Sequence, residues 1–136
     1  MPLTPVPCHR VVAVVLTHAD RLCLLRRSRE VGSDTGRWHC VTGFLPFDTD
    51  PRDQALAEVR EETGLDYPQL GALVAGNTLQ LPDASGHPWT VFTFSCEVTE
   101  PHLRINWEHD AYAWVPRPAE GRDLVPWLHD VVAAVA

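Results

Sequence analysis

Residues 43–65 read GFLPFDTDPRDQALAEVREETGL, and they predict a short loop followed by one capped helix. Asp50 is a preferred residue just before a helix, and Pro51 has a backbone angle suited to the first helical position. Gly64 can adopt the left-handed conformation with which many helices end. The sequence therefore predicts a helix over residues 51–63.

Three carboxylates, Glu58, Glu61 and Glu62, follow one another closely near the end of this helix. At about 100° per residue they fall within a sector of roughly 100° on one face. Like charges at this spacing repel, and acids at a helix C-terminus oppose the helix dipole. A bound cation would reverse both effects, although such an acidic run by itself is usually a solvated helix face. Gly43 before the helix, Gly64-Leu65 at its end and the predicted strand that starts at Trp38 together favour a metal site.

The whole stretch resembles the Nudix box, the signature of the Nudix hydrolase superfamily, which reads G-x5-E-x7-R-E-U-x-E-E-x-G-U with U an aliphatic residue. Thr49 stands where the box has its first Glu, and Ala57 stands where it has Arg. The resemblance makes Gly43 and Gly64 structural residues of the box. The positions that match in register are Gly43, Glu58, Val59, Glu61, Glu62, Gly64 and Leu65.

The resemblance implies an α/β fold, a Nudix-type α/β/α sandwich with a mixed β-sheet, and one domain over residues 1–136. It implies hydrolysis of a diphosphate linked to another group, X, with Mg²⁺ or Mn²⁺ as the cofactor. Both are hard cations that prefer carboxylate oxygens. Glu58 and Glu62 would be metal ligands, and Glu61 would be a further ligand or the catalytic residue that deprotonates water.

Residues outside the box are candidates as well. Glu108, between Trp107 and His109, resembles a late acid of many Nudix hydrolases that completes the metal site or acts as general base; an exposed loop acid is the alternative. Arg27 is the last residue of a predicted strand and would contact substrate phosphates through its planar guanidinium, unless it is a solvated strand end. Phe44 and Trp107 would stack on a flat ring of the substrate.

The substrate class is suggested by the residues that precede the box helix. The chain has Val41-Thr42-Gly43 where many family members have Pro-Gly-Gly. Together with the preceding Trp38 and the later Glu108-His109, this resembles the dihydroneopterin triphosphate pyrophosphatase branch. A nucleoside or pteridine triphosphate is therefore one expectation. Because Thr49 and Ala57 depart from the box, the alternative is a degenerate Nudix domain that binds a nucleotide or a protein partner without hydrolysis. A third hypothesis is an acidic α/β domain without a metal.

Composition excludes several functions. The net charge of -7 argues against binding of a nucleic-acid polymer, which needs a basic face. All 11 basic residues are Arg, so lysine chemistry is excluded. No segment approaches the ~20 apolar residues of a membrane span. We expect a cytoplasmic protein, and small Nudix proteins are commonly homodimers.

Hydrophobic patterning outside the box predicts a mixture of strands and a terminal helix, without the regular alternation of a doubly wound sheet. The strand over residues 89–98 is the clearest, because apolar side chains alternate along it. In the box helix, Leu56, Val59 and either Ala55 or Thr63 are expected to face the core. The predicted strands are 10–17, 22–27, 38–41, 71–81 with a bend at 76–77, 89–98 and 112–115, and the predicted terminal helix is 123–135.

Overall fold

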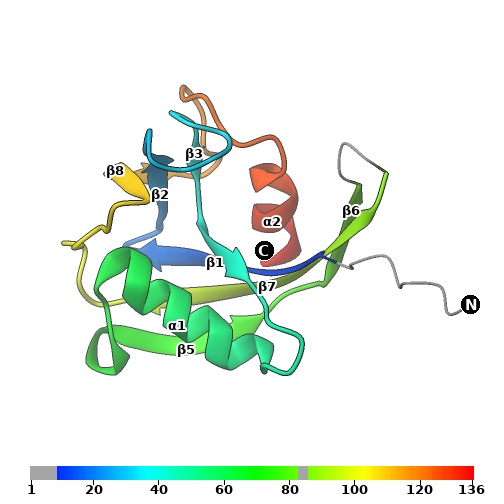
Figure 1. The fold of residues 1–136 in the computed structure, drawn as a ribbon. Coiled ribbons are helices and arrows are strands. Elements are labelled where there is room, and N and C mark those ends of the chain that lie inside the picture. Colours follow the sequence, from blue (N-terminus) through cyan, green and yellow to red (C-terminus); the bar gives the residue numbers. More distant parts are fainter. Residues whose placement is uncertain (1–8, 83–85) are drawn as a thin grey trace, which may run out of the picture.

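The computed structural model describes residues 9–82 and 86–136. Within them, strands form a mixed sheet, and helices α1 and α2 lie on its opposite sides (Figure 1). Part of the loop predicted between the strands that end at 81 and begin at 89 lies outside the described residues. The elements are β1 (His9–His18), β2 (Arg21–Arg27), β3 (Trp38–His39), β4 (Val41–Phe44), α1 (Pro51–Thr63), η1 (Tyr67–Gln69), β5 (Leu70–Ala75), β6 (Leu79–Pro82), β7 (Pro88–Val98), β8 (His109–Pro116) and α2 (Leu128–Ala134).

Strand β1 is the centre of the sheet. It runs parallel to β7 along most of its length, and on its other side it pairs antiparallel with β4 and then with β2. Strand β2 also pairs with β3 and β8, and β7 also pairs with β5 and β6. Parallel and antiparallel pairs therefore occur in one sheet, as the Nudix resemblance implied.

The apolar residues of β1 alternate between two cores because successive strand side chains point to opposite faces. Val12 belongs to the cluster that contains Val59 of α1, whereas Ala13 belongs to the cluster that contains Val131 of α2. Each face of the sheet is thus covered by one helix. The predicted α/β/α sandwich is confirmed.

Helix α1 begins and ends where the sequence predicted. The Asp50 side chain accepts a hydrogen bond from the Arg52 backbone at 2.8 Å, and Gly64 ends the helix with φ 74°. The prediction for Leu56 was wrong: it is half-buried and belongs to neither core cluster. The buried face of α1 includes the carboxylates Glu58 and Glu62, so Leu56 lies at the edge of that face. The buried residues of α1 are Ala55, Glu58, Val59, Glu62 and Thr63.

Four predicted elements, three strands and the terminal helix, need correction. The strand predicted over 71–81 is divided at Gly76 into β5 and β6, the one over 38–41 is divided into β3 and β4, and the one over 112–115 extends to the whole of β8. The terminal helix does not begin at 123. Val125 instead donates its backbone N–H to the Trp38 carbonyl at 2.9 Å, and Pro126 favours an extended residue before it.

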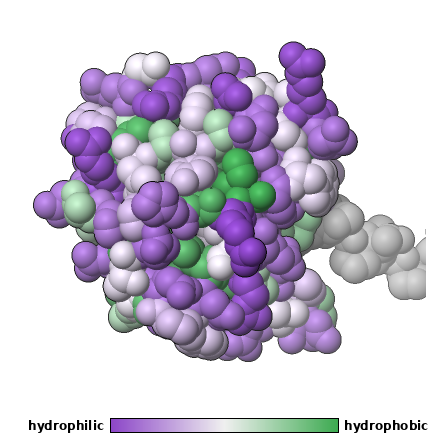
Figure 2. All heavy atoms as spheres, turned by 90° about the vertical axis from the view of Figure 1, so that its left-hand side faces the viewer, coloured by the Kyte–Doolittle hydropathy of each residue, from purple (hydrophilic) through white to green (hydrophobic). Residues whose placement is uncertain are grey.

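Neither helix of the described part of the chain is long and apolar enough to cross a membrane. The side of the molecule that carries β8 is shown in Figure 2, and most of its surface is hydrophilic. Apolar side chains appear there only as small separate areas. This face therefore offers no broad apolar surface for a partner.

Candidate functional site

Helix α1 carries Glu58 and Glu62 into the protein interior, where their side chains lie against β4. Glu62 is 1% exposed and Glu58 is 9% exposed, and the two carboxyl groups lie within hydrogen-bonding reach of each other. Gln54 Nε2 donates to Glu58 Oε1 at 2.9 Å, and the backbone of Thr42 hydrogen-bonds Glu62. Glu62 Oε2 is buried and receives no hydrogen bond within the described residues.

Burial raises the pKa of both carboxyl groups, and that of Glu62 lies well above its usual range. The neighbouring Glu58 and Glu108 raise the pKa of Glu62 further, because a second negative charge in a poorly solvated place is unfavourable. Without a cation, Glu62 therefore keeps its proton to a higher pH than an ordinary carboxyl group does. A cation between these carboxylates would take the place of that proton.

Glu108 precedes β8 and faces the same region. Asn106 Nδ2 donates to its Oε1 at 3.4 Å, and its charge raises the pKa of both buried carboxyl groups. Glu61, one residue before Glu62, is exposed on the outer side of α1. The structure thus brings Glu58, Glu62 and Glu108 near one another and leaves Glu61 at the solvent side. Within residues 9–82 and 86–136, no three acidic, His or Cys side chains form a ready-made metal cage.

Gly43 on β4 lies directly against the Glu58 side chain. A Cβ atom at position 43 would overlap the Glu58 carboxylate, so only glycine leaves room for it. Gly64 has a different task, since it supplies the left-handed residue that ends α1. One glycine sets the spacing between α1 and β4, and the other sets the length of α1.

His109, the first residue of β8, is buried beside the pair. Its Nε2 lies 3.7 Å from Glu62 Oε1. Burial and the nearby Arg27 guanidinium lower the His109 pKa to about 4, so the ring is neutral at pH 7 and the contact is not an ion pair. The sequence alone gave His109 no catalytic role, and the structure places it in contact distance of a candidate metal ligand.

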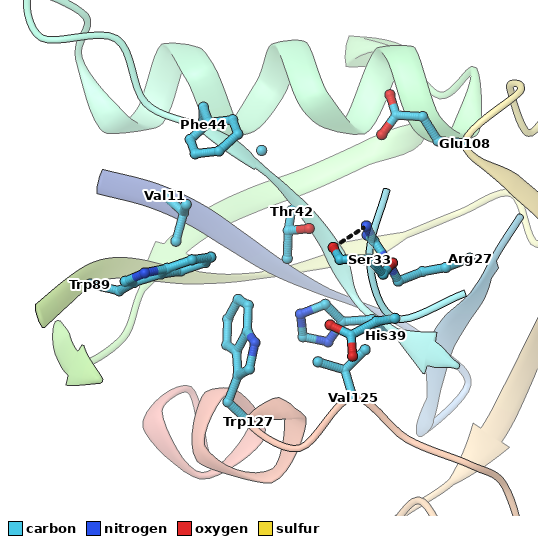
Figure 3. A pocket seen from close by; sticks show the side chains of 12 residues that line it. Val11, Arg27, Ser33, His39, Thr42, Phe44, Trp89, Glu108, Val125 and Trp127 are labelled. Atoms are coloured by element: carbon cyan, nitrogen blue, oxygen red, sulfur yellow. Dashed lines mark hydrogen bonds between the residues drawn. The ribbon is translucent and has the colours of Figure 1, made fainter. Parts of the chain in front are cut away.

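A cavity of about 210 Å³ lies on the other side of β4 (Figure 3). Thr42 and Gly43 line it, so a single strand separates it from the buried carboxylates. Figure 3 shows Arg27 and Glu108 toward one side, Phe44, Trp89 and Trp127 toward the other, and His39 between them. Arg27 Nε donates to the Ser33 carbonyl at 2.8 Å. The aromatic residues of the lining are Phe44, His39, Trp89 and Trp127.

The cavity contains two of the three predicted substrate-binding residues, Arg27 and Phe44. Trp107 is 63% exposed and does not line it. Sequence reasoning missed Trp89 and Trp127. Trp89 begins the strand predicted over residues 89–98, and Trp127 lies in the helix predicted over residues 123–135, so neither position indicated a binding site. The clue was Pro126, because a proline one residue before Trp127 marks a chain bend beside an aromatic residue.

Comparison with known proteins identifies the family. The model of the NUDIX domain matches residues 7–134 of the chain. The chain belongs to the NUDIX family. A curated relative of this NUDIX chain, the RNA pyrophosphohydrolase of Gluconacetobacter diazotrophicus, is 28% identical over 145 residues, which cover 92% of this chain and 87% of that protein.

Solved NUDIX structures share the fold at lower identity. The MutT NUDIX hydrolase from Burkholderia pseudomallei is 16% identical with a TM-score of 0.80, and the alignment covers 96% of this chain and 99% of that one. The NUDIX domain of Shewanella oneidensis NrtR, solved with ADP ribose, is 18% identical with a TM-score of 0.65, over 96% and 80% of the two chains. The predicted family, fold and enzyme class are therefore confirmed: this NUDIX protein belongs to a family of hydrolases that act on phosphoanhydrides.

Proposed function

We propose that this NUDIX protein is a Mg²⁺-dependent pyrophosphohydrolase of a small substrate in which a diphosphate is linked to a nucleoside-like or pterin-like group. One observation carries the proposal. Glu62 is fully buried beside Glu58, its Oε2 has no hydrogen-bond donor in the described chain, and only β4 separates the pair from a cavity that is lined by Arg27.

The residues present fit a divalent cation. Mg²⁺ in proteins is commonly held by one or two carboxylates together with water and substrate phosphates, so Glu58 and Glu62 need no further cage. The carboxylate oxygen without a donor, Glu62 Oε2, is the kind of atom that such an ion would satisfy. Bound Mg²⁺ supplies Lewis-acid polarisation of the diphosphate and a more acidic water. NUDIX enzymes generally use divalent metals, and Mn²⁺ would suit the same oxygens.

The other residues receive roles from their positions. Glu108 lines the cavity and lies near the carboxylate pair, so it accepts the proton of the attacking water. Arg27 lines the same cavity, and its guanidinium neutralises substrate phosphate. Glu61 is the exposed carboxylate nearest the pair in sequence and is the second candidate for the proton-accepting role.

The substrate is a small molecule in this proposal. A relative is named for RNA pyrophosphate hydrolysis and a structural neighbour holds ADP ribose, and both chemistries contain a nucleotide phosphoanhydride. The net charge of -7 still disfavours a polymer that needs a basic face. A cytoplasmic location and a homodimer, both predicted from the sequence, stay predictions.

The proposal is tested by incubating the protein with Mg²⁺ and a panel of nucleoside triphosphates, nucleotide sugars, dinucleotides and pteridine triphosphates. Products are identified by mass. We expect release of a monophosphate-containing product from at least one compound, and none when EDTA replaces Mg²⁺. If no compound of the panel yields a product while at least one raises the melting temperature, hydrolysis is contradicted. That result would support the alternative of binding without hydrolysis, which Thr49 and Ala57 motivate.

A further inference from the structure

His39 is a buried side chain with unmet hydrogen-bonding capacity. It is 2% exposed, it lines the cavity beside β4, and neither of its ring nitrogens has a partner within the described residues. Buried polar atoms in folded proteins are nearly always hydrogen-bonded, so an exception calls for a function. An imidazole whose two nitrogens lack partners at the wall of a cavity is suited to bind a polar group of a ligand.

The protonation of His39 limits which ligand it can bind. Burial and the nearby Arg27 guanidinium lower its pKa to about 3, so the ring is neutral at pH 7. A neutral imidazole has one N–H donor and one nitrogen acceptor. It would therefore bind a ligand atom that accepts or donates a single hydrogen bond, and it carries no charge to attract a phosphate.

Three rings meet at steep angles around this position (Figure 3). The Trp127 indole stands edge-on to His39, with ring centroids 4.4 Å apart and planes at 76°. The ring centroids of Trp89 and Trp127 are 6.3 Å apart, and their planes form an angle of 69°. Both indoles are half-buried and line the cavity. A flat ligand ring would fit such a corner, because it can lie on the face of one indole and against the edge of the other.

We propose that the corner formed by His39, Trp89 and Trp127 binds the planar heteroaromatic ring of the substrate, a nucleobase or pterin, and that His39 determines specificity through one hydrogen bond to a ring heteroatom. The inference rests on the proposed function, and it specifies the group that is linked to the substrate diphosphate. The polarity of the cavity agrees, since Arg27 and Glu108 lie away from the two indoles and leave the opposite side for the phosphates (Figure 3).

The test measures ring binding without catalysis. In EDTA, the tryptophan fluorescence of the wild type is titrated with GMP, AMP, UMP, CMP, neopterin and, as a probe without a ring, ribose 5-phosphate. We expect at least one ring compound to quench the fluorescence and to bind at least about tenfold more tightly than ribose 5-phosphate. The proposal is overturned if no ring compound does so.

Two variants assign the effect to His39. His39→Phe keeps a flat ring but removes both nitrogens, and it should weaken binding of the preferred ring compound roughly three- to tenfold, the range of one hydrogen bond. His39→Gln restores a donor and an acceptor and should recover part of the affinity. His129→Phe, the same change at an exposed position of α2, should bind as the wild type does. Wild-type affinity in His39→Phe would overturn the proposal.

A spectroscopic measurement covers the case in which His39→Phe does not fold. The imidazole ¹⁵N signals of wild-type His39 should shift when the preferred ring compound binds and stay in place with ribose 5-phosphate; unmoved signals with both would overturn the role. The outcomes are separable from those of the proposed function. Ring binding in EDTA with no hydrolysis of any panel compound contradicts only the proposed function, whereas hydrolysis with an unchanged KM in His39→Phe contradicts only the inference.

Discussion

The Glu58 carboxylate occupies the space in which a side chain at position 43 would stand. The contact brings α1 against β4 so closely that the buried carboxylates lie one strand away from the cavity. Thr42, the neighbour of Gly43, lines that cavity and hydrogen-bonds Glu62 through its backbone. The box glycine thereby connects the acidic helix with the space for a substrate.

Gly43→Ala should displace Glu58, because its methyl group and the carboxylate cannot share one position. We expect a lower melting temperature, at least tenfold weaker Mg²⁺ binding by calorimetry, and a loss of hydrolysis. Gly32→Ala is the matched control, since a Cβ atom there meets nothing within 4 Å. Equal Mg²⁺ affinities in the two variants would show that Glu58 does not depend on this contact.

Glu62→Gln should be more stable than the wild type in EDTA at pH 8. The folded Glu62 pKa lies well above the usual 4.5, so the folded protein keeps a proton that the unfolded chain has lost. Stability therefore falls as the pH rises from about 4.5 toward the raised pKa. Gln cannot ionise, and the melting-temperature difference between the variant and the wild type should grow between pH 5 and pH 8. A constant difference would contradict a protonated Glu62.

The two buried histidines, His39 and His109, should make the folded protein less stable as the pH falls, which is opposite to the effect of Glu62. The folded pKa values of His39 and His109 are about 3 and about 4, against 6.5 for an ordinary histidine. Below pH 6.5 the unfolded chain gains protons that the folded protein does not, so stability is lost as the pH falls toward 4. His39→Gln should lose less than the wild type between pH 7 and pH 5 in thermal melts. His129→Gln, on the surface, should follow the wild type.

Gly64→Ala should destabilise the fold by about 1 kcal/mol without removing Mg²⁺ binding, because a residue with a side chain is strained at φ 74°. The Cβ atom would also come within 3.1 Å of the Arg104 side chain. Gly64→Asn should cost less, since asparagine tolerates the left-handed region. Chemical denaturation gives both values. An unchanged midpoint in Gly64→Ala would contradict the assigned role of this cap.

The sequence predicted what local chemistry determines. Asp50, Pro51 and Gly64 are sufficient to place α1, and the two-residue alternation of β7 requires no knowledge of its neighbours. It did not predict the features that depend on tertiary contacts. Leu56 lies at the margin because the inward face of α1 includes two carboxylates. Val125 lies outside the terminal helix because its backbone N–H is bound to the Trp38 carbonyl.

In the candidate site, too, the sequence predicted the local features and not those that depend on tertiary contacts. Spacing along α1 placed Glu58, Glu61 and Glu62 on one face; the structure buries Glu58 and Glu62 and leaves Glu61 exposed. The cavity could not be predicted, because β1, β2, β3, β4, β7 and the segment before α2 all contribute to it, and several of these are distant in the sequence. His39 and Trp127 line the cavity only through the tertiary fold, whereas Trp107 lies exposed outside it.

Turnover by Glu62→Gln is the most direct test of the proposal that a buried carboxylate pair supports Mg²⁺-dependent hydrolysis. With the best compound of the panel and saturating Mg²⁺, kcat/KM should fall at least about a hundredfold in Glu62→Gln, while its melting temperature in EDTA stays at or above that of the wild type. Glu120→Gln, an exposed change elsewhere, should keep wild-type turnover. Wild-type turnover in a folded Glu62→Gln protein would contradict the proposed site.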